Sequence, residues 1–194
     1  MDKSKNNTKY QSILKTSKLL LWKHGIKRVT IEEICTEAHV SKMTFYKYFP
    51  NKIELAKTIL QKVTEESLQK FRSIVNGGLP FTEKVKEMIL LKFEASENIS
   101  TEFINDIYKN HEYGLSQYME EQAKISLKLF VDFLTDSQNK GLIRKGVKVE
   151  FILTYINQAF SMFDNTDLVS KYAQPHDLIM ELTNFLFYGL KPNE

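Results

Sequence analysis

Residues 30–52 read TIEEICTEAHVSKMTFYKYFPNK, and this stretch holds two short helical patterns that are separated by a turn and closed by a proline. Thr30 is a suitable N-cap for the first pattern, and two glutamates follow in the first turn, where the helix dipole favours carboxylates. Ser41 can cap the second pattern, and Pro50 ends it. The stretch therefore predicts a helix-turn-helix.

The second helix of this motif has two different faces. At about 100° per residue, Phe45 and Phe49 point to one side, which indicates a contact with the core. The other side carries lysines, hydroxyl groups and a methionine, as is typical of a helix in the DNA major groove, although a merely solvated helix is the alternative. Thr44, Tyr46 and Lys52 are predicted to contact phosphates. The full set predicted to bind DNA is Thr30, Ser41, Lys42, Met43, Thr44, Tyr46, Lys47, Tyr48 and Lys52.

The motif resembles the DNA-binding motif of the TetR/AcrR family of transcriptional regulators. The matching residues cover about the first third of the chain and are Ile13, Leu14, Leu20, Leu21, Gly25, Thr30, Ile31, Ile34, Ala38, Val40, Ser41, Thr44, Tyr46, Phe49, Lys52 and Leu55. Two residues depart from the family pattern, because His39 stands where glycine is usual and Cys35 where alanine is usual. Histidine can adopt the positive φ of such a turn, with more strain than glycine.

The composition indicates an all-α protein. Among 194 residues, 42% are hydrophobic and 26% charged, and seven glycines and four prolines are few. Long stretches also carry apolar residues at helical spacing. We expect a three-helix N-terminal DNA-binding domain over residues 1–51 and a larger helical ligand-binding and dimerisation domain over 52–194. Residues 52–76 form a bridging helix in this division, and the start of that helix, with Lys52, is predicted to grip a phosphate.

The charge is distributed unevenly along the chain. Residues 1–60 hold twelve Lys/Arg against five Asp/Glu, a net charge of +7, while residues 61–194 hold fifteen against nineteen, a net charge of −4. A polyanion is attracted to the basic part and gains affinity by releasing counterions, whereas the acidic remainder repels it. Charge alone does not identify DNA, but together with the helix-turn-helix it predicts double-stranded DNA as the partner.

Other classes of function lack support in the sequence. The four histidines and the lone Cys35 show no metal-ligand spacing, and no glycine-rich phosphate loop occurs. We therefore expect no metal, no cofactor, no catalytic residue and no enzymatic activity. The absence of an apolar signal segment and of an apolar run of about 18 residues predicts a cytoplasmic protein without a membrane partner.

Aromatic and methionine side chains are frequent in the middle helices. Such side chains suit a flat or apolar small molecule, although plain core is the alternative. The family resemblance favours a pocket, because TetR/AcrR members typically enclose an effector between these helices. The candidate lining residues are Met88, Phe93, Phe103, Tyr108, Tyr113, Phe130, Phe133 and Phe163.

The last two helices are apolar over more than one face. Such helices must bury the excess, and a two-fold partner that supplies the same pair would complete a four-helix bundle. The predicted homodimer interface comprises Ile152, Ile156, Phe160, Leu178, Leu182, Phe185 and Leu186.

These expectations combine into a ligand-responsive transcriptional regulator. It would act as a repressor that binds a palindromic operator as a dimer and is released by a small lipophilic or aromatic effector. The alternative is an architectural or scaffolding DNA-binding protein of the same fold without a small-molecule switch. Weakening of DNA binding by lipophilic compounds distinguishes the two.

Overall fold

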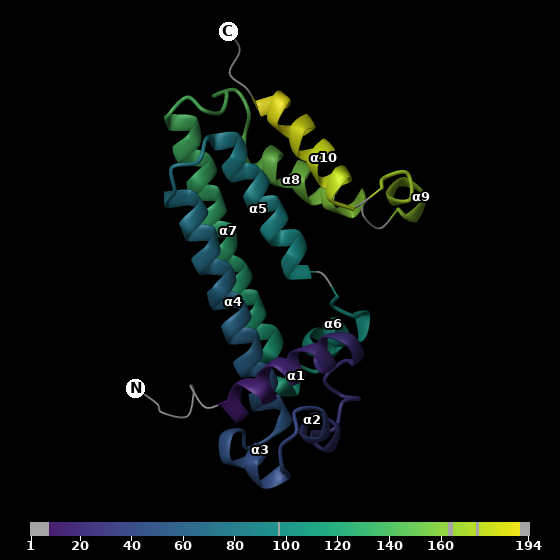
Figure 1. Cartoon of the computed structure of the whole chain (residues 1–194). Coiled ribbons are helices and arrows are strands. Elements are labelled where there is room, and N and C mark those ends of the chain that lie inside the picture. The colour runs from purple at the N-terminus through teal and green to yellow at the C-terminus, as the bar shows by residue number, and fades with distance from the viewer. Residues whose placement is uncertain (1–7, 97, 163–164, 174, 191–194) are drawn as a thin grey trace. The chain divides into compact units, whose positions relative to one another are not determined.

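The computed structural model describes residues 8–96, 98–162, 165–173 and 175–190, and these residues form helices with no strand among them (Figure 1). The all-α prediction is confirmed. The helices are α1 Thr8–His24, α2 Ile31–Glu37, α3 Lys42–Tyr48, α4 Lys52–Asn76, α5 Phe81–Ser96, α6 Thr101–Lys109, the short 3₁₀ helix η1 His111–Tyr113, α7 Leu115–Asn139, α8 Val149–Ser161, α9 Thr166–Val169 and α10 Pro175–Leu190.

The chain divides into two compact units. Unit 1 comprises Met1–Ser67 and Ser96–Ala123, and unit 2 comprises Leu68–Ala95 and Lys124–Glu194. The long helices α4 and α7 each contribute to both units, so the boundary between the units differs from the one expected between residues 51 and 52. Because α6 and the start of α7 pack with the helix-turn-helix, they belong to the same unit as α1 to α3.

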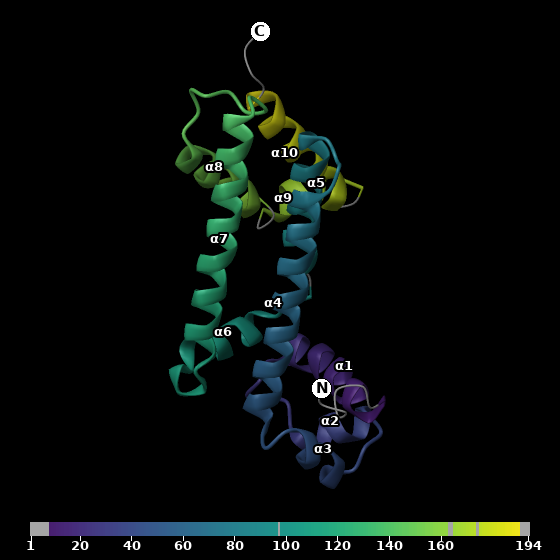
Figure 2. The same cartoon turned by 90° about the vertical axis from the view of Figure 1, so that its left-hand side faces the viewer.

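Unit 1 is built around the helix-turn-helix. Helices α1, α2 and α3 lie together beside the first turns of α4 (Figures 1 and 2). Phe45 of α3, fully buried, contributes to the same core as Leu55 of α4 and Phe103 of α6. Tyr10 of α1 stacks on Phe49 at a centroid distance of 5.4 Å. The apolar face predicted for the second helix of the motif is therefore the face that packs.

Unit 2 has a separate core. Its buried side chains come from α5, α7, α8, α10 and the loop after α7, and they are Val85, Met88, Phe133, Leu134, Ile143, Val147, Ile152, Ile156, Leu186 and Leu190. Helix α5 begins at Phe81, directly after Pro80. The short α9, capped by Asn165, was not predicted, since four residues give too little periodicity.

Candidate nucleic-acid interface

The two helices of the motif begin at the predicted caps. Thr30 Oγ1 accepts a hydrogen bond of 3.1 Å from the Glu33 amide, and Ser41 Oγ accepts one of 3.1 Å from the Thr44 amide. The Ser41 and Thr44 hydroxyl groups also lie 3.0 Å apart. Two of the predicted DNA-binding residues, Thr30 and Ser41, therefore cap the helix starts, since their side-chain oxygens satisfy amides that have no partner within the helix.

The turn between α2 and α3 uses a left-handed residue. His39 has a φ of +54°, the conformation expected at this departure from the family pattern. The turn is held by hydrogen bonds from the His39 amide to the Thr36 carbonyl, 3.1 Å, and from the Val40 amide to the Cys35 carbonyl, 2.9 Å. A non-glycine residue in this region carries backbone strain that the surrounding contacts must offset.

The outward face of α3 is open to solvent. Met43 is 83% exposed and Tyr46 53% exposed. Lys42 and Lys47 are exposed, while Thr44 and Tyr48 are half-buried. The structure thus gathers the predicted base-edge and groove residues on one face of a helix whose other face is core, which is the arrangement that a major-groove helix needs.

Tyr48 contributes partly to the core. Its ring meets Tyr10 edge to face at a centroid distance of 5.5 Å. Hence only part of this side chain is available to a ligand of the α3 face.

An ion pair connects the two helices of the motif. The Lys42 ammonium donates to Glu32 of α2, and both side chains are exposed. The hydrogen bond and the charge of Lys42 lower the pKa of Glu32, and the same hydrogen bond raises the pKa of Lys42. The sequence does not predict this pair, because the two residues are ten apart and meet only across the turn.

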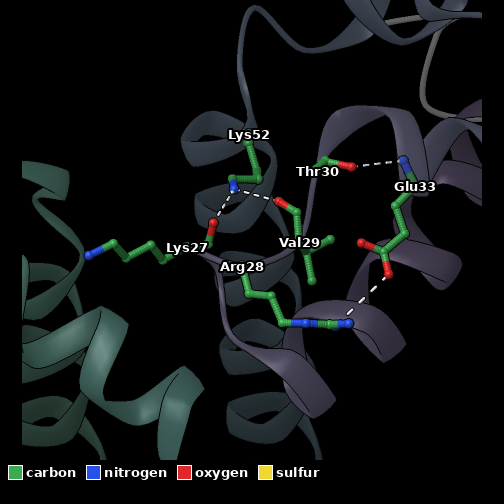
Figure 3. A network of polar contacts seen from close by, with 6 residues as sticks. All are labelled: Lys27, Arg28, Val29, Thr30, Glu33 and Lys52. Atoms are coloured by element: carbon green, nitrogen blue, oxygen red, sulfur yellow. Dashed lines mark hydrogen bonds and ion pairs between the residues drawn. The ribbon is translucent and has the colours of Figure 1, made fainter.

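Lys52 is placed differently from the expectation. Its ammonium donates to the Lys27 carbonyl at 3.2 Å and to the Val29 carbonyl at 2.5 Å (Figure 3). Burial lowers its pKa, an effect partly opposed by the charges of Asp106 and Glu33. In the free protein, this predicted phosphate ligand is occupied by the segment that joins α1 to α2.

The predicted effector-binding residues fall in two cores. Phe103 is buried in unit 1 against Trp22, with ring centroids 4.3 Å apart, and Tyr113 packs on the same core. Tyr108 is 43% exposed. Met88, Phe130 and Phe133 belong to unit 2. Phe163 and the side chain of Phe93 lie outside the described residues. The structure thus does not collect the set into one described core.

The predicted interface residues differ in exposure. Four are already buried within the single chain, namely Ile152, Ile156, Leu178 and Leu186. Leu182 is half-buried, and the side chain of Phe160 lies outside the described part. Phe185 is 70% exposed and stacks on Tyr155 of α8 at 6.3 Å. Among the described side chains, the large exposed apolar residues of α8 and α10 are Phe185 and two residues not predicted, Phe151 and Tyr188, which are 62% and 72% exposed.

None of the described helices combines the length and apolar content that crossing a membrane requires.

Comparisons with known proteins agree with the geometry of the motif. Residues 13–59, which span most of α1, all of α2 and α3, and the start of α4, match the family model of the bacterial regulatory proteins of the tetR family. The HTH-type transcriptional repressor KstR2 of Mycobacterium tuberculosis is 21% identical over 155 residues, 77% of this chain and 76% of the relative.

Solved regulators share the fold beyond the motif. The fatty acid degradation regulator FadR from Bacillus halodurans superposes with a TM-score of 0.71 at 22% identity, covering 95% of this chain and 97% of that one. FadR from Bacillus subtilis, solved in complex with stearoyl-CoA, superposes with a TM-score of 0.69 at 19% identity, covering 93% and 99%. These structures show the fold of the whole chain, and the matched model identifies residues 13–59 as a DNA-binding domain of the tetR family of bacterial regulatory proteins.

Proposed function

We propose that this protein is a homodimeric transcriptional repressor that binds a palindromic operator and is released by a small lipophilic effector. The observation that carries the proposal is the outward face of α3, where exposed Lys42, Met43, Tyr46 and Lys47 follow a capped helix start in the basic part of the chain. In this proposal residues 1–51 read DNA, residues 52–194 bind the effector and the second protomer, and the protein works in the cytoplasm.

The dimer is proposed from the exposed apolar side chains of α8 and α10. Large apolar side chains that are mostly exposed on neighbouring helices are typical of a surface that a partner covers. A second copy of the same helices would cover Phe151, Phe185 and Tyr188. Two copies of α3 could then enter successive major grooves, provided that they lie about 34–36 Å apart.

The effector class is proposed from two facts. Met88, Phe130 and Phe133 supply apolar and aromatic surface in unit 2, and FadR of Bacillus subtilis was solved with stearoyl-CoA. A long-chain acyl thioester is therefore the first compound to test. Its acyl chain would pack on apolar side chains, as is usual for small-molecule sites.

The test selects the bound sequence and then asks whether the compound releases it. The full-length protein is incubated with a random-sequence DNA library, and the retained duplexes are sequenced. We expect two inverted half-sites, loss of binding in Tyr46→Ala and Lys47→Ala, and release of wild-type protein by stearoyl-CoA but not by coenzyme A alone. Binding that persists with every lipophilic compound would favour an architectural role, and failure to retain any duplex would exclude the proposal.

A further inference from the structure

The segment that joins α1 to α2 is held by the first residue of α4, Lys52. Lys52 reaches two carbonyls of this segment, those of Lys27 and Val29, so one ammonium bridges two backbone acceptors (Figure 3). An ammonium has three N–H donors, and two of them are used here. Lys52 is half-buried, in contrast to Lys42 and Lys47 on the outward face of α3.

The same segment is held by α6. Asp106, a buried residue of α6, accepts a 2.8 Å hydrogen bond at Oδ2 from the Lys27 amide. Gly25 makes this approach feasible, because a Cβ there would lie 2.7 Å from the same Oδ2. In addition, the amide of Ser100, the N-cap of α6, donates to the carbonyl of Trp22 near the end of α1 at 2.8 Å. Lys27 therefore donates to α6 and accepts from α4 through its own backbone.

The contacts that Lys52 and Asp106 make with the backbone of Lys27 and Val29, together called the double hold, fix the segment from which the helix-turn-helix begins. Thr30, which caps α2, follows immediately after Val29. Ile26 and Val29 are themselves fully buried, so the segment is fixed by its side chains as well as by its backbone. A shift of the segment would move the start of α2, and α3 begins only five residues after α2 ends.

We infer that Lys52 is a positioning residue for DNA binding, which fixes the segment 25–29 and thereby the start of α2, and that it does not itself neutralise a DNA phosphate. The inference rests on the proposed function and replaces the phosphate contact expected from the sequence. Both carbonyl contacts keep the ammonium at the segment, and turning it toward a phosphate would take a partner from the Val29 carbonyl, whose contact with Lys52 is partly buried. Asp106 makes the second contact of the double hold, by accepting a hydrogen bond from the Lys27 amide.

Salt dependence separates positioning from phosphate contact. Each phosphate neutralised by a lysine contributes about 0.9 to the slope of log K against log salt concentration. The binding of a labelled random-sequence duplex of about 30 bp is measured by fluorescence anisotropy between about 50 and 200 mM KCl, the range in which such contacts change affinity strongly. The full-length variants are Lys52→Met, Lys47→Met and, as a control for loss of an exposed charge, Lys109→Met.

We expect Lys52→Met to bind the duplex about three- to tenfold more weakly with the wild-type slope, because only a fraction of molecules then hold the binding geometry. Lys47→Met should reduce the slope, and Lys109→Met should change neither quantity. A Lys52→Met variant with the reduced slope, or with wild-type affinity, would overturn the inference while leaving the proposed function intact. Absence of binding by the wild-type protein would instead count against the proposed function.

Variants of Asp106 test the same inference in a separate experiment, which remains available if Lys52→Met does not fold. Asp106→Ala removes a negative charge, so charge alone would leave DNA binding unchanged or tighten it. Positioning instead predicts weaker binding for Asp106→Ala and near-normal binding for Asp106→Asn, which retains an acceptor for the Lys27 amide. Circular dichroism at the assay temperature verifies that both variants are folded. Wild-type or tighter binding by folded Asp106→Ala would refute the inference that the contacts with residues 25–29 position the helix-turn-helix.

Discussion

At the scale of single residues, we expect the exposed pair of Glu32 and Lys42 to limit how readily Lys42 meets DNA. Glu32→Gln should tighten binding to a random-sequence duplex by about two- to fivefold, because Lys42 is released and a charge repelled by phosphates is removed. Glu37→Gln, an equal charge change at another exposed position of α2, is the matched control. An equal effect of both substitutions would show that the pairing with Lys42 is irrelevant, and weaker binding in Glu32→Gln would show that Glu32 orients Lys42.

The pH dependence of this pair follows from the directions of its pKa shifts. The pKa of Glu32 is lowered, so its contribution to stability is present above the pKa of the unfolded chain and is lost as the pH falls through the folded value. The pKa of Lys42 is raised, so the pair is also lost as the pH rises through that folded value. The affinity ratio of Glu32→Gln to wild type should therefore be constant between about pH 6 and 9. A ratio that changes within this range would implicate another titrating group.

At the scale of elements, the start of α3 depends on one hydroxyl group. Ser41→Ala removes the acceptor of the Thr44 amide and should lower the free energy of unfolding by about 1 kcal/mol. Ser41→Asp keeps an acceptor at the cap and should retain stability in urea unfolding. Equal losses in both variants would mean that the hydroxyl contact with Thr44 matters more than the cap.

The sequence was most informative where a local rule applies. The caps at Thr30 and Ser41, the positive φ at His39 and the buried face of α3 each depend on residues within one or two turns. The hold on Lys27 could not be predicted, because Asp106 is 79 positions away and no periodicity relates the two. Lys52 shows the same limit, since its position at a helix start indicated a phosphate ligand, whereas the contacts with the 25–29 segment arise only from tertiary packing.

At the scale of the whole molecule, exposure distinguishes residues of the proposed dimer surface from residues of the core. Phe185→Glu alters an exposed side chain of α10 and should convert a dimer into a folded monomer. Leu186→Glu, one position later, places a charge in the buried core of unit 2 and should unfold the protein. Sedimentation and circular dichroism report the two outcomes. A dimer that survives Phe185→Glu would locate the interface elsewhere.

A regulator that switches between two states must also couple its two ligands. If stearoyl-CoA weakens operator binding, the operator must weaken stearoyl-CoA binding by the same factor, a coupling of about 1–3 kcal/mol. Calorimetric titration of the compound into free protein and into the operator complex measures this factor. Equal affinities in the two titrations would leave a DNA-binding protein without an effector switch.

The backbone hold on Lys27 has a consequence for sequence variation in this protein. Both interactions use the peptide groups of residue 27, and its side chain is exposed, so neither contact specifies a side chain there. A saturation library selected for DNA binding should accept nearly every amino acid at this position and reject proline, which lacks the amide. Gly25 should behave in the opposite way, since its φ of +83° and the neighbouring carboxylate leave no room for a substituent. A position that tolerates most side chains and a position that accepts only glycine can therefore lie two residues apart in one loop.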